Sequence, residues 1–139
     1  MVPMRLSGIQ SSGWIPVFAG LTAWCSAQSL LAQAVGDPVN GQKLYEGKCG
    51  ACHSVEANRV GPLHRGVVGR PPGTAPGYDY SPAVKKLRGV WTPARIDLWL
   101  QDPQKVAPGT KMYFQVTDPG QRRDIIAYLV SVSPARPKP

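Results

Sequence analysis

The stretch Cys49-Gly50-Ala51-Cys52-His53 constrains the fold more than any other part of the 139-residue chain. Its pattern, C-x-x-C-H, is the attachment signature of a c-type haem. Residues three apart on a helical turn lie on one face, so both thiols can reach the same porphyrin edge. His53 follows at the position from which an imidazole can ligate the iron. The motif therefore predicts a chain folded around one haem c, attached covalently through Cys49 and Cys52.

Two other uses of paired cysteines fit the sequence less well. A thioredoxin-like C-x-x-C motif needs a β-α-β pattern around it, and residues 49–52 have none. A structural zinc site needs about four ligands. Only one further cysteine, Cys25, and one further histidine, His64, are available, and Cys25 lies in the leader described below.

The formal net charge of +8 makes a negatively charged partner plausible on physical grounds. The basic residues are scattered, and no run is longer than Lys85-Lys86 or Arg122-Arg123. A scattered basic surface favours an acidic protein partner over a polybasic membrane anchor, and we expect no nucleic-acid binding. The length fits one small domain, whose modest core a buried haem would enlarge.

Residues 1–34 have the features of an export signal. Arg5 is the only charge before Asp37, an apolar stretch occupies residues 14–24, and Ala32-Gln33-Ala34 is a small-x-small cleavage pattern. We expect cleavage after Ala34, with Ala27 as the second choice and an uncleaved anchor as the remaining alternative. The expected location is the periplasm, with no stable membrane insertion after cleavage, a folded domain over 35–132 and a disordered tail over 133–139.

Four helix starts are predicted from one repeated device, a capping residue followed by proline. Proline at the first helical position lacks only an amide that has no partner there, and the preceding side chain accepts bonds from the free amides. The predicted helices cover residues 38–48, 82–87, 93–101 and 119–131. Residues 60–76 and 104–117 are expected to be loops, with Pro103 ending the third helix. The fold class is therefore all-α, with about four helices around the haem.

Met112 is the candidate for the sixth iron ligand. It is the only methionine after the leader and lies in a loop rich in Gly and Lys, Pro108-Gly109-Thr110-Lys111-Met112. A methionine commonly fills gaps in a core, but such a loop is an awkward place for that role. His64 is the rival, although it would have to reach the opposite face of the ring only eleven residues after His53. Ligation by His53 and Met112 closes both axial positions and favours electron exchange over substrate binding.

With these ligands placed, the chain resembles the class I cytochromes c, in the soluble mitochondrial and bacterial electron-carrier branch. The resemblance runs from about Gly36 to Leu129. The matches, in chain order, are Gly41, Tyr45, the motif at 49–53, Gly61-Pro62, residues 66–70, Tyr80, Trp91, residues 108–112, Phe114 and residues 124–129.

The resemblance implies roles for these positions. The Pro62 carbonyl would accept the proton on the far nitrogen of His53 and fix the ring. Gly41 would allow the first and last helices to cross closely, and Phe114 would shield the exposed haem edge. A further set would donate hydrogen bonds to the haem propionates: Tyr80, Trp91, Arg70 and, as a helper, Thr110.

The chain departs from the family pattern in three places. Leu63-His64-Arg65 stands where Asn-Leu-His is usual after Gly-Pro, and Trp99 stands where the family usually has a tyrosine near the methionine. The loop between His53 and Gly61 also looks short.

The resemblance implies an electron-transfer protein rather than an enzyme. It would be a monomeric, soluble one-electron carrier between respiratory or photosynthetic membrane complexes. Its partners would be acidic surfaces of a cytochrome bc complex, a terminal oxidase or a dehydrogenase. The candidate docking lysines are Lys43, Lys48, Lys105 and Lys111, with Lys85 and Lys86 to one side. The alternatives are a dedicated acceptor for one periplasmic dehydrogenase and a haem enzyme or sensor with an open iron.

Overall fold

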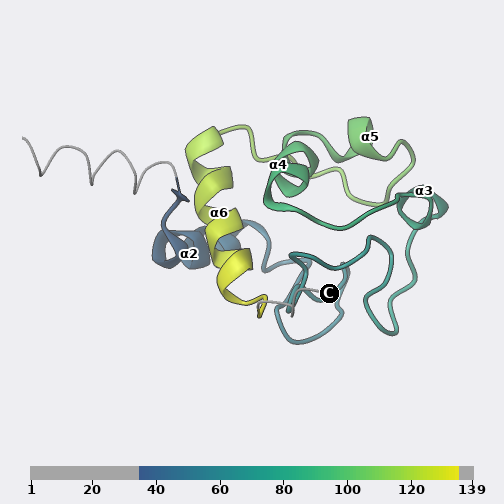
Figure 1. Ribbon diagram of the computed structural model, residues 1–139, viewed down its shortest axis with the longest axis horizontal. Coiled ribbons are helices and arrows are strands. Elements are labelled where there is room, and N and C mark those ends of the chain that lie inside the picture. The colour runs from purple at the N-terminus through teal and green to yellow at the C-terminus, as the bar shows by residue number, and fades with distance from the viewer. Residues whose placement is uncertain (1–34, 135–139) are drawn as a thin grey trace, which may run out of the picture.

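The computed structural model describes residues 35–134, and in that part of the chain the regular elements are helices without any strand. Figure 1 shows α2 and α6 crossing on one side, with α3, α4 and α5 on the other and long loops between them. The bounds are α2 Pro38–Lys48, α3 Pro82–Lys85, α4 Pro93–Gln101, α5 Pro103–Val106 and α6 Pro119–Ser131. The predicted all-α class is confirmed.

The capping-residue-plus-proline device starts the helices as predicted. The Asp37 carboxylate accepts a bond from Val39 N at the start of α2, and Asp118 accepts one from Gln121 N at the start of α6. The ends of α2, α4 and α6 also lie where the sequence placed them. Only α3 differs, ending at Lys85, two residues before the predicted end at Leu87.

The short helix α5 corrects the predicted loop over residues 104–117. Asp102 performs two tasks here. Its backbone N–H closes α4 by donating to Leu98 O, and its carboxylate accepts bonds from Gln104 N and Lys105 N at the start of α5. Pro103 thus ends one helix and begins the next, so Asp102-Pro103 is a fifth copy of the device that was interpreted only as a stop signal.

The closest helix contact is the crossing of α2 and α6. A Cβ atom placed on Gly41 would lie 1.9 Å from the carbonyl oxygen of Asp124, so only glycine permits this approach. The Asp124 carboxylate also accepts hydrogen bonds from Asp37 N (2.8 Å) and Asn40 Nδ2 (2.7 Å). The two ends of the described chain are therefore tied together.

The core lies along α6, which packs on α2 and on α4, around the fully buried side chain of Ile125. A second, smaller cluster forms beneath α3 and the loop before it. The main cluster consists of Tyr45, Val67, Trp91, Ile96, Leu100, Val116, Ile125, Ile126 and Leu129, and the second of Ala75, Tyr80, Val84 and Ala107. The two clusters form the walls of the cavity described below.

The folded part of the chain extends one residue beyond the predicted domain end. Ser133 Oγ accepts a bond from Val68 N (3.1 Å) and donates to Leu129 O (2.7 Å), so Ser133 belongs to the packed domain and not to a tail. The predicted leader at 1–34 and the remainder of the predicted tail, 135–139, lie outside the described residues. None of the described helices combines the length and the apolar character needed to cross a membrane.

Candidate haem site

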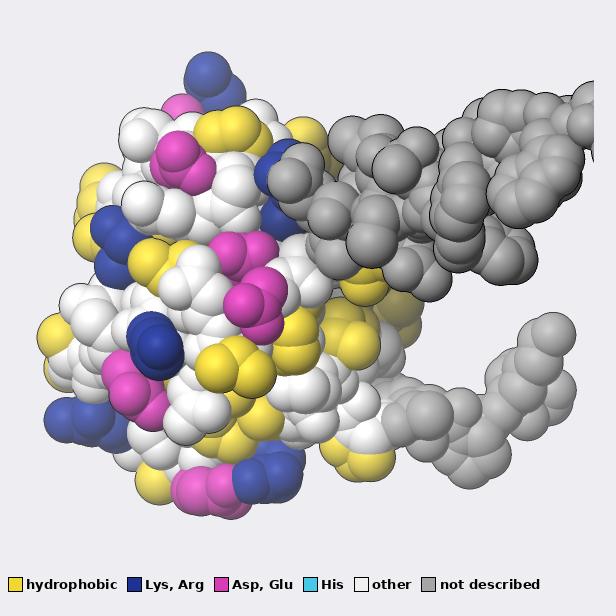
Figure 2. Space-filling view, turned by 90° about the vertical axis from the view of Figure 1, so that its left-hand side faces the viewer, with side chains coloured by type: hydrophobic (Ala, Val, Ile, Leu, Met, Phe, Trp, Pro, Cys, Tyr) yellow, Lys and Arg dark blue, Asp and Glu magenta, His cyan; other side chains and the backbone are white. Residues whose placement is uncertain are grey.

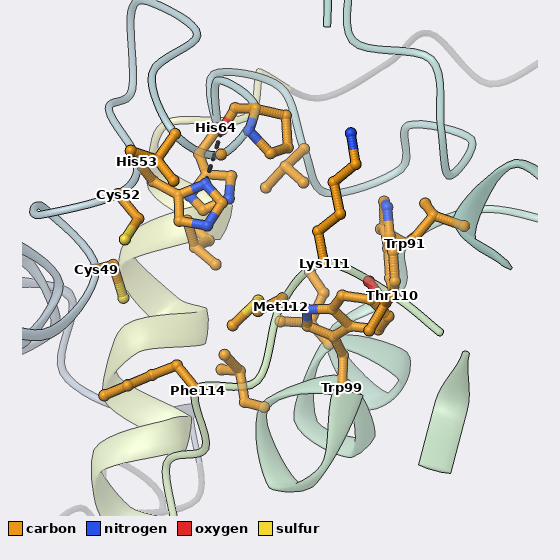
Figure 3. Close-up of a pocket in the computed structure, with 18 of the residues that line it drawn as sticks. Cys49, Cys52, His53, His64, Trp91, Trp99, Thr110, Lys111, Met112 and Phe114 are labelled. Carbon is orange, nitrogen blue, oxygen red and sulfur yellow. Dashed lines mark hydrogen bonds between the residues drawn. The ribbon is translucent and has the colours of Figure 1, made fainter. Parts of the chain in front are cut away.

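One cavity of about 610 Å³ opens between the helices and the two long loops. This volume lies within the ~300–1,000 Å³ typical of ligand and cofactor pockets. The structure brings together around it every residue predicted for the site, namely Cys49, Cys52, His53, Pro62, Arg70, Tyr80, Trp91, Thr110 and Met112. Figure 3 shows Cys49, Cys52 and His53 on one side, with Met112 facing them from the other.

The attachment motif continues the last turn of α2. Cys52 N and His53 N both donate to Cys49 O, at 3.1 and 2.8 Å, so the two sulfurs and the imidazole project to the same side. Cys49 and Cys52 are free thiols. Burial raises the pKa of the Cys49 thiol to about 11, against the opposing charge of Lys48.

The His53 imidazole is held by its neighbours in the chain. Its Nδ1 lies 2.8 Å from Pro62 O, the bond expected from the sequence, which leaves Nε2 as the nitrogen able to ligate a metal. A Cβ on Gly61 would lie 2.2 Å from His53 Cε1, so the backbone at Gly61 touches the ring. Burial lowers the pKa of His53, opposed by the bond to Pro62.

Met112 is held by residues of α4 and α5. The indole N–H of Trp99 donates to Met112 Sδ at 3.2 Å. Gln104 Nε2 donates to Thr110 O (2.9 Å) and Met112 O (3.0 Å), while Gln104 Oε1 accepts from Gly109 N (3.1 Å). The sequence analysis noted Trp99 but missed Gln104. Recognising Asp102-Pro103 as a helix start would have placed Gln104 in the first turn of α5.

Four residues proposed as propionate donors are buried and line the cavity: Arg70, Tyr80, Trp91 and Thr110. Tyr80 Oη accepts a bond from Ala75 N, which leaves its O–H available to donate. Arg70 makes contacts the sequence did not predict: its terminal nitrogens donate to Leu63 O (2.8 Å) and Arg65 O (3.2 Å). Within the protein, Arg70 therefore braces the loop that carries His64.

His64 lies on the same side of the cavity as His53. The two imidazole rings stack with their centroids 4.1 Å apart and their planes at 18°. An axial ligand on the opposite face of a haem cannot come from a ring in that position. The geometry therefore argues against the alternative of two histidine ligands and leaves Met112 as the candidate facing His53.

The cavity mouth carries exposed apolar side chains. Val60 is 75% exposed, Tyr113 74% and Phe114 47%. Cys52 is also exposed, and the side chains of Lys48 and Lys111 line the same cavity. The mouth is therefore an apolar surface with cationic groups beside it, the composition expected of an edge that contacts another protein.

The family model named Cytochrome c matches residues 38–133. The chain belongs to the cytochrome c family. A cytochrome c2 of Rhodopila globiformis is 50% identical over 97 residues, covering 68% of this chain and 92% of that protein. A cytochrome c2 of Rhodomicrobium vannielii is 40% identical over 107 residues, covering 74% and 85%. The solved structure of cytochrome cH from Methylobacterium extorquens shares 46% identity at a TM-score of 0.66, covering 69% of this chain and 99% of that one.

The chain is thus a class I c-type cytochrome, and the family binds haem c covalently. The residues present fit that group. Two thiols stand at the attachment spacing, an imidazole and a thioether face each other, and the lining is mainly apolar with hydrogen-bond donors among its residues. The cofactor predicted from Cys49 and Cys52 is confirmed, and electron transfer by haem c is the activity of the family.

Proposed function

We propose that this protein is a one-electron carrier in which His53 and Met112 ligate the iron of the covalent haem. One observation carries the proposal: the imidazole and the thioether face each other across one cavity that also receives both cysteines. Held by these two side chains, the iron would have no site left for a substrate. The bound haem supplies an iron that changes its oxidation state by one electron.

The chain holds each proposed ligand in one place, which keeps the rearrangement on electron transfer small. The carbonyl of Pro62 anchors Nδ1 of His53, the N–H of Trp99 bonds the Met112 sulfur, and the amide of Gln104 bonds the Met112 carbonyl. Thioether ligation favours the reduced iron and raises the potential. The mainly apolar lining excludes water, which strengthens every charge interaction inside.

The proposed propionate partners are the buried donors that line the cavity, Tyr80, Trp91, Thr110 and Arg70. A buried carboxylate is costly unless it is hydrogen-bonded, and these side chains carry groups able to do so. Ser81, which the sequence analysis did not select, also lines the cavity. The donors would fix the orientation of the haem and stabilise its negative charge.

Acidic proteins are the proposed partners, meeting the apolar mouth with its neighbouring lysines. All six lysines named from the sequence are exposed, but Lys85 and Lys111 both pair with Asp79, at 3.2 and 3.3 Å. Lys48 lines the mouth and has no such partner among the described ion pairs. On the face shown in Figure 2, acidic and basic side chains are interspersed, so that face presents no patch of a single sign.

The partner proposal is tested by the salt dependence of electron transfer to an acidic oxidase. Steering by opposite charge weakens steeply with ionic strength, so the second-order rate should fall as salt is raised. Lys48→Gln should reduce both the low-salt rate and the slope, whereas Lys86→Gln, which lies outside the cavity lining, should change them less. A rate that is indifferent to salt would contradict steering.

We place the protein in the periplasm on the strength of the leader pattern before Val35, and we propose that it acts as a monomer. Cell fractionation tests the location, the mass of the holoprotein identifies its first residue, and sedimentation tests the monomer. A mass beginning after Ala34 or Ala27 supports export with cleavage. A mass beginning at Met1 in a membrane fraction supports the anchor instead.

The ligand set is tested by the visible spectrum of the purified holoprotein. The ferric form should show the weak near-red band of a thioether–iron bond. Met112→Ala should abolish the band, lower the midpoint potential and let the ferrous form bind carbon monoxide promptly, while Tyr113→Ala at the neighbouring exposed position should do none of these. A band that survives Met112→Ala, or prompt carbon monoxide binding by the unmodified protein, would overturn the proposal in favour of an open iron.

A further inference from the structure

A second imidazole lies against the proposed proximal ligand. The ring of His64 stacks on the ring of His53, with 4.1 Å between centroids and 18° between planes. His64 stands where the resembled family usually has a leucine, so the family pattern does not account for an aromatic, hydrogen-bonding side chain here. The question is what this second ring does.

The backbone around His64 is fixed on every side. His64 N donates to Ser54 O and Arg65 N to Val55 O, each at 2.9 Å, which ties the loop to the segment after the attachment motif. Arg70 donates to the carbonyls of the residues immediately before and after His64. These bonds fix the backbone that carries the His64 ring, and only the rotation of the side chain itself remains to be restrained.

Tyr45 of α2 fixes the remaining freedom of the His64 ring. Its Oη lies 3.0 Å from His64 Nδ1, and its ring meets the imidazole edge-on with 5.6 Å between centroids. Tyr45 is itself packed on Tyr128 of α6, at 5.2 Å. A row of rings thus connects the helix crossing to His53.

The other contacts of His53 do not by themselves hold the plane of its ring. The Pro62 carbonyl restrains the ring through one atom, Nδ1, and the Gly61 backbone limits the ring's approach. A flat ring packed face to face is the contact that resists rotation of the imidazole plane. We propose that His64, held by Tyr45, is a positioning residue that fixes the rotation of the His53 ring about its bond to iron. This rests on the proposed function, in which His53 is the proximal ligand.

The holoprotein tests this by proton NMR of the ferric form, in which the spread and order of the four haem methyl resonances depend on the orientation of the axial imidazole plane. We expect His64→Leu, which keeps the volume but removes the ring, to change that spread and order. Tyr45→Phe, which removes only the O–H, should change the resonances in the same direction and less. Tyr128→Phe, at the same helix crossing, should leave them where they are.

The double variant sharpens the test, because Tyr45 is proposed to act only through His64. Tyr45→Phe combined with His64→Leu should give the resonance pattern of His64→Leu alone. A folded His64→Leu protein with unchanged methyl resonances would overturn the proposal and make His64 a core filler. If His64→Leu does not fold, Tyr45→Phe decides alone, and an unchanged pattern then overturns it.

Failure of the proposed ligand set would look different. The ring protons of a coordinated histidine are strongly shifted in the ferric spectrum. Their absence from the unmodified protein would contradict ligation by His53 itself, whatever the variants do. Their presence, together with methyl resonances that do not respond to His64→Leu, would leave the proposed function intact and remove only the positioning role.

Discussion

Gln104 should control how easily Met112 leaves the iron. Its side-chain amide makes three hydrogen bonds across the methionine loop, two as donor and one as acceptor, and no other described side chain holds the Met112 carbonyl. When the loop opens, all three bonds are lost together. Gln104→Ala removes them without touching Met112 or the cavity lining.

The magnitude follows from the number and setting of these bonds. A neutral hydrogen bond contributes a net ~0.5–1.5 kcal/mol, and these are only partly buried, which places the total at ~1.5–3 kcal/mol. Since 1.4 kcal/mol is a factor of ten, the equilibrium for loop opening should rise about 10- to 100-fold. Gln104→Glu should be at least as severe, because it keeps the bond from Gly109 N but turns a carboxylate toward two carbonyl oxygens.

The assay is a titration of the ferric holoprotein with imidazole, followed through loss of the near-red band. An external ligand binds only when Met112 has moved away, so its apparent Kd should fall by the same 10- to 100-fold. Gln101→Ala is the matched control, since its amide bonds Asp97 on α4 and does not reach the loop. Equal imidazole affinity in the Gln104→Ala and unmodified proteins would refute the reasoning.

Three further predictions follow from single contacts. Trp99→Phe removes the N–H that draws charge from Met112 Sδ, so the sulfur should donate more electron density to the ferric iron. The midpoint potential should then fall by about 20–40 mV in a redox titration. This figure takes ~0.5–1 kcal/mol for the hydrogen bond and 59 mV per factor of ten. The two lysine partners of Asp79 lower the pKa of its carboxyl group. The stability that the ionised Asp79 contributes to the fold is therefore present above the ordinary carboxyl pKa and is lost as pH falls through the lowered pKa of the folded protein. Asp79→Asn should lower the urea midpoint near neutral pH, and the variant and the unmodified protein should unfold at the same urea concentration after acidification. Gly41→Ala should cost about 2–3 kcal/mol or more in urea unfolding because its Cβ meets α6 backbone, whereas Gly47→Ala in the same helix, with nothing within 4 Å, should be neutral or stabilise by ~0.5–1 kcal/mol.

Helix starts were predictable because they depend on neighbours in the sequence. A side-chain oxygen before a proline satisfies free amides within the next three residues, and this local chemistry gave four starts correctly. The same device at Asp102-Pro103 was misinterpreted because it directly follows another helix. A four-residue helix such as α5 has no periodicity to reveal it, and proline after an apolar helix more often means an end.

The members of the site were predictable from motif spacing and family resemblance, but their contacts were not. Arg70 was expected to donate to a propionate, and the bonds that it also makes to two loop carbonyls were not expected. The pairing of Tyr45 with His64 joins residues from a helix and a loop. Such pairs depend on how distant segments pack, and no local pattern in either segment indicates them.

The crossing of α2 and α6 also sets the order in which this protein can mature. It joins residues 87 positions apart, through the bond between Asp37 and Asp124. Closing so long a loop costs chain entropy that only the contacts between the first and last helices can offset. Both motif thiols lie far ahead of the last helix in the chain, and Tyr128 of that helix backs the row of rings behind the imidazole. The wall behind His53 is therefore complete only once the last helix has packed on the first.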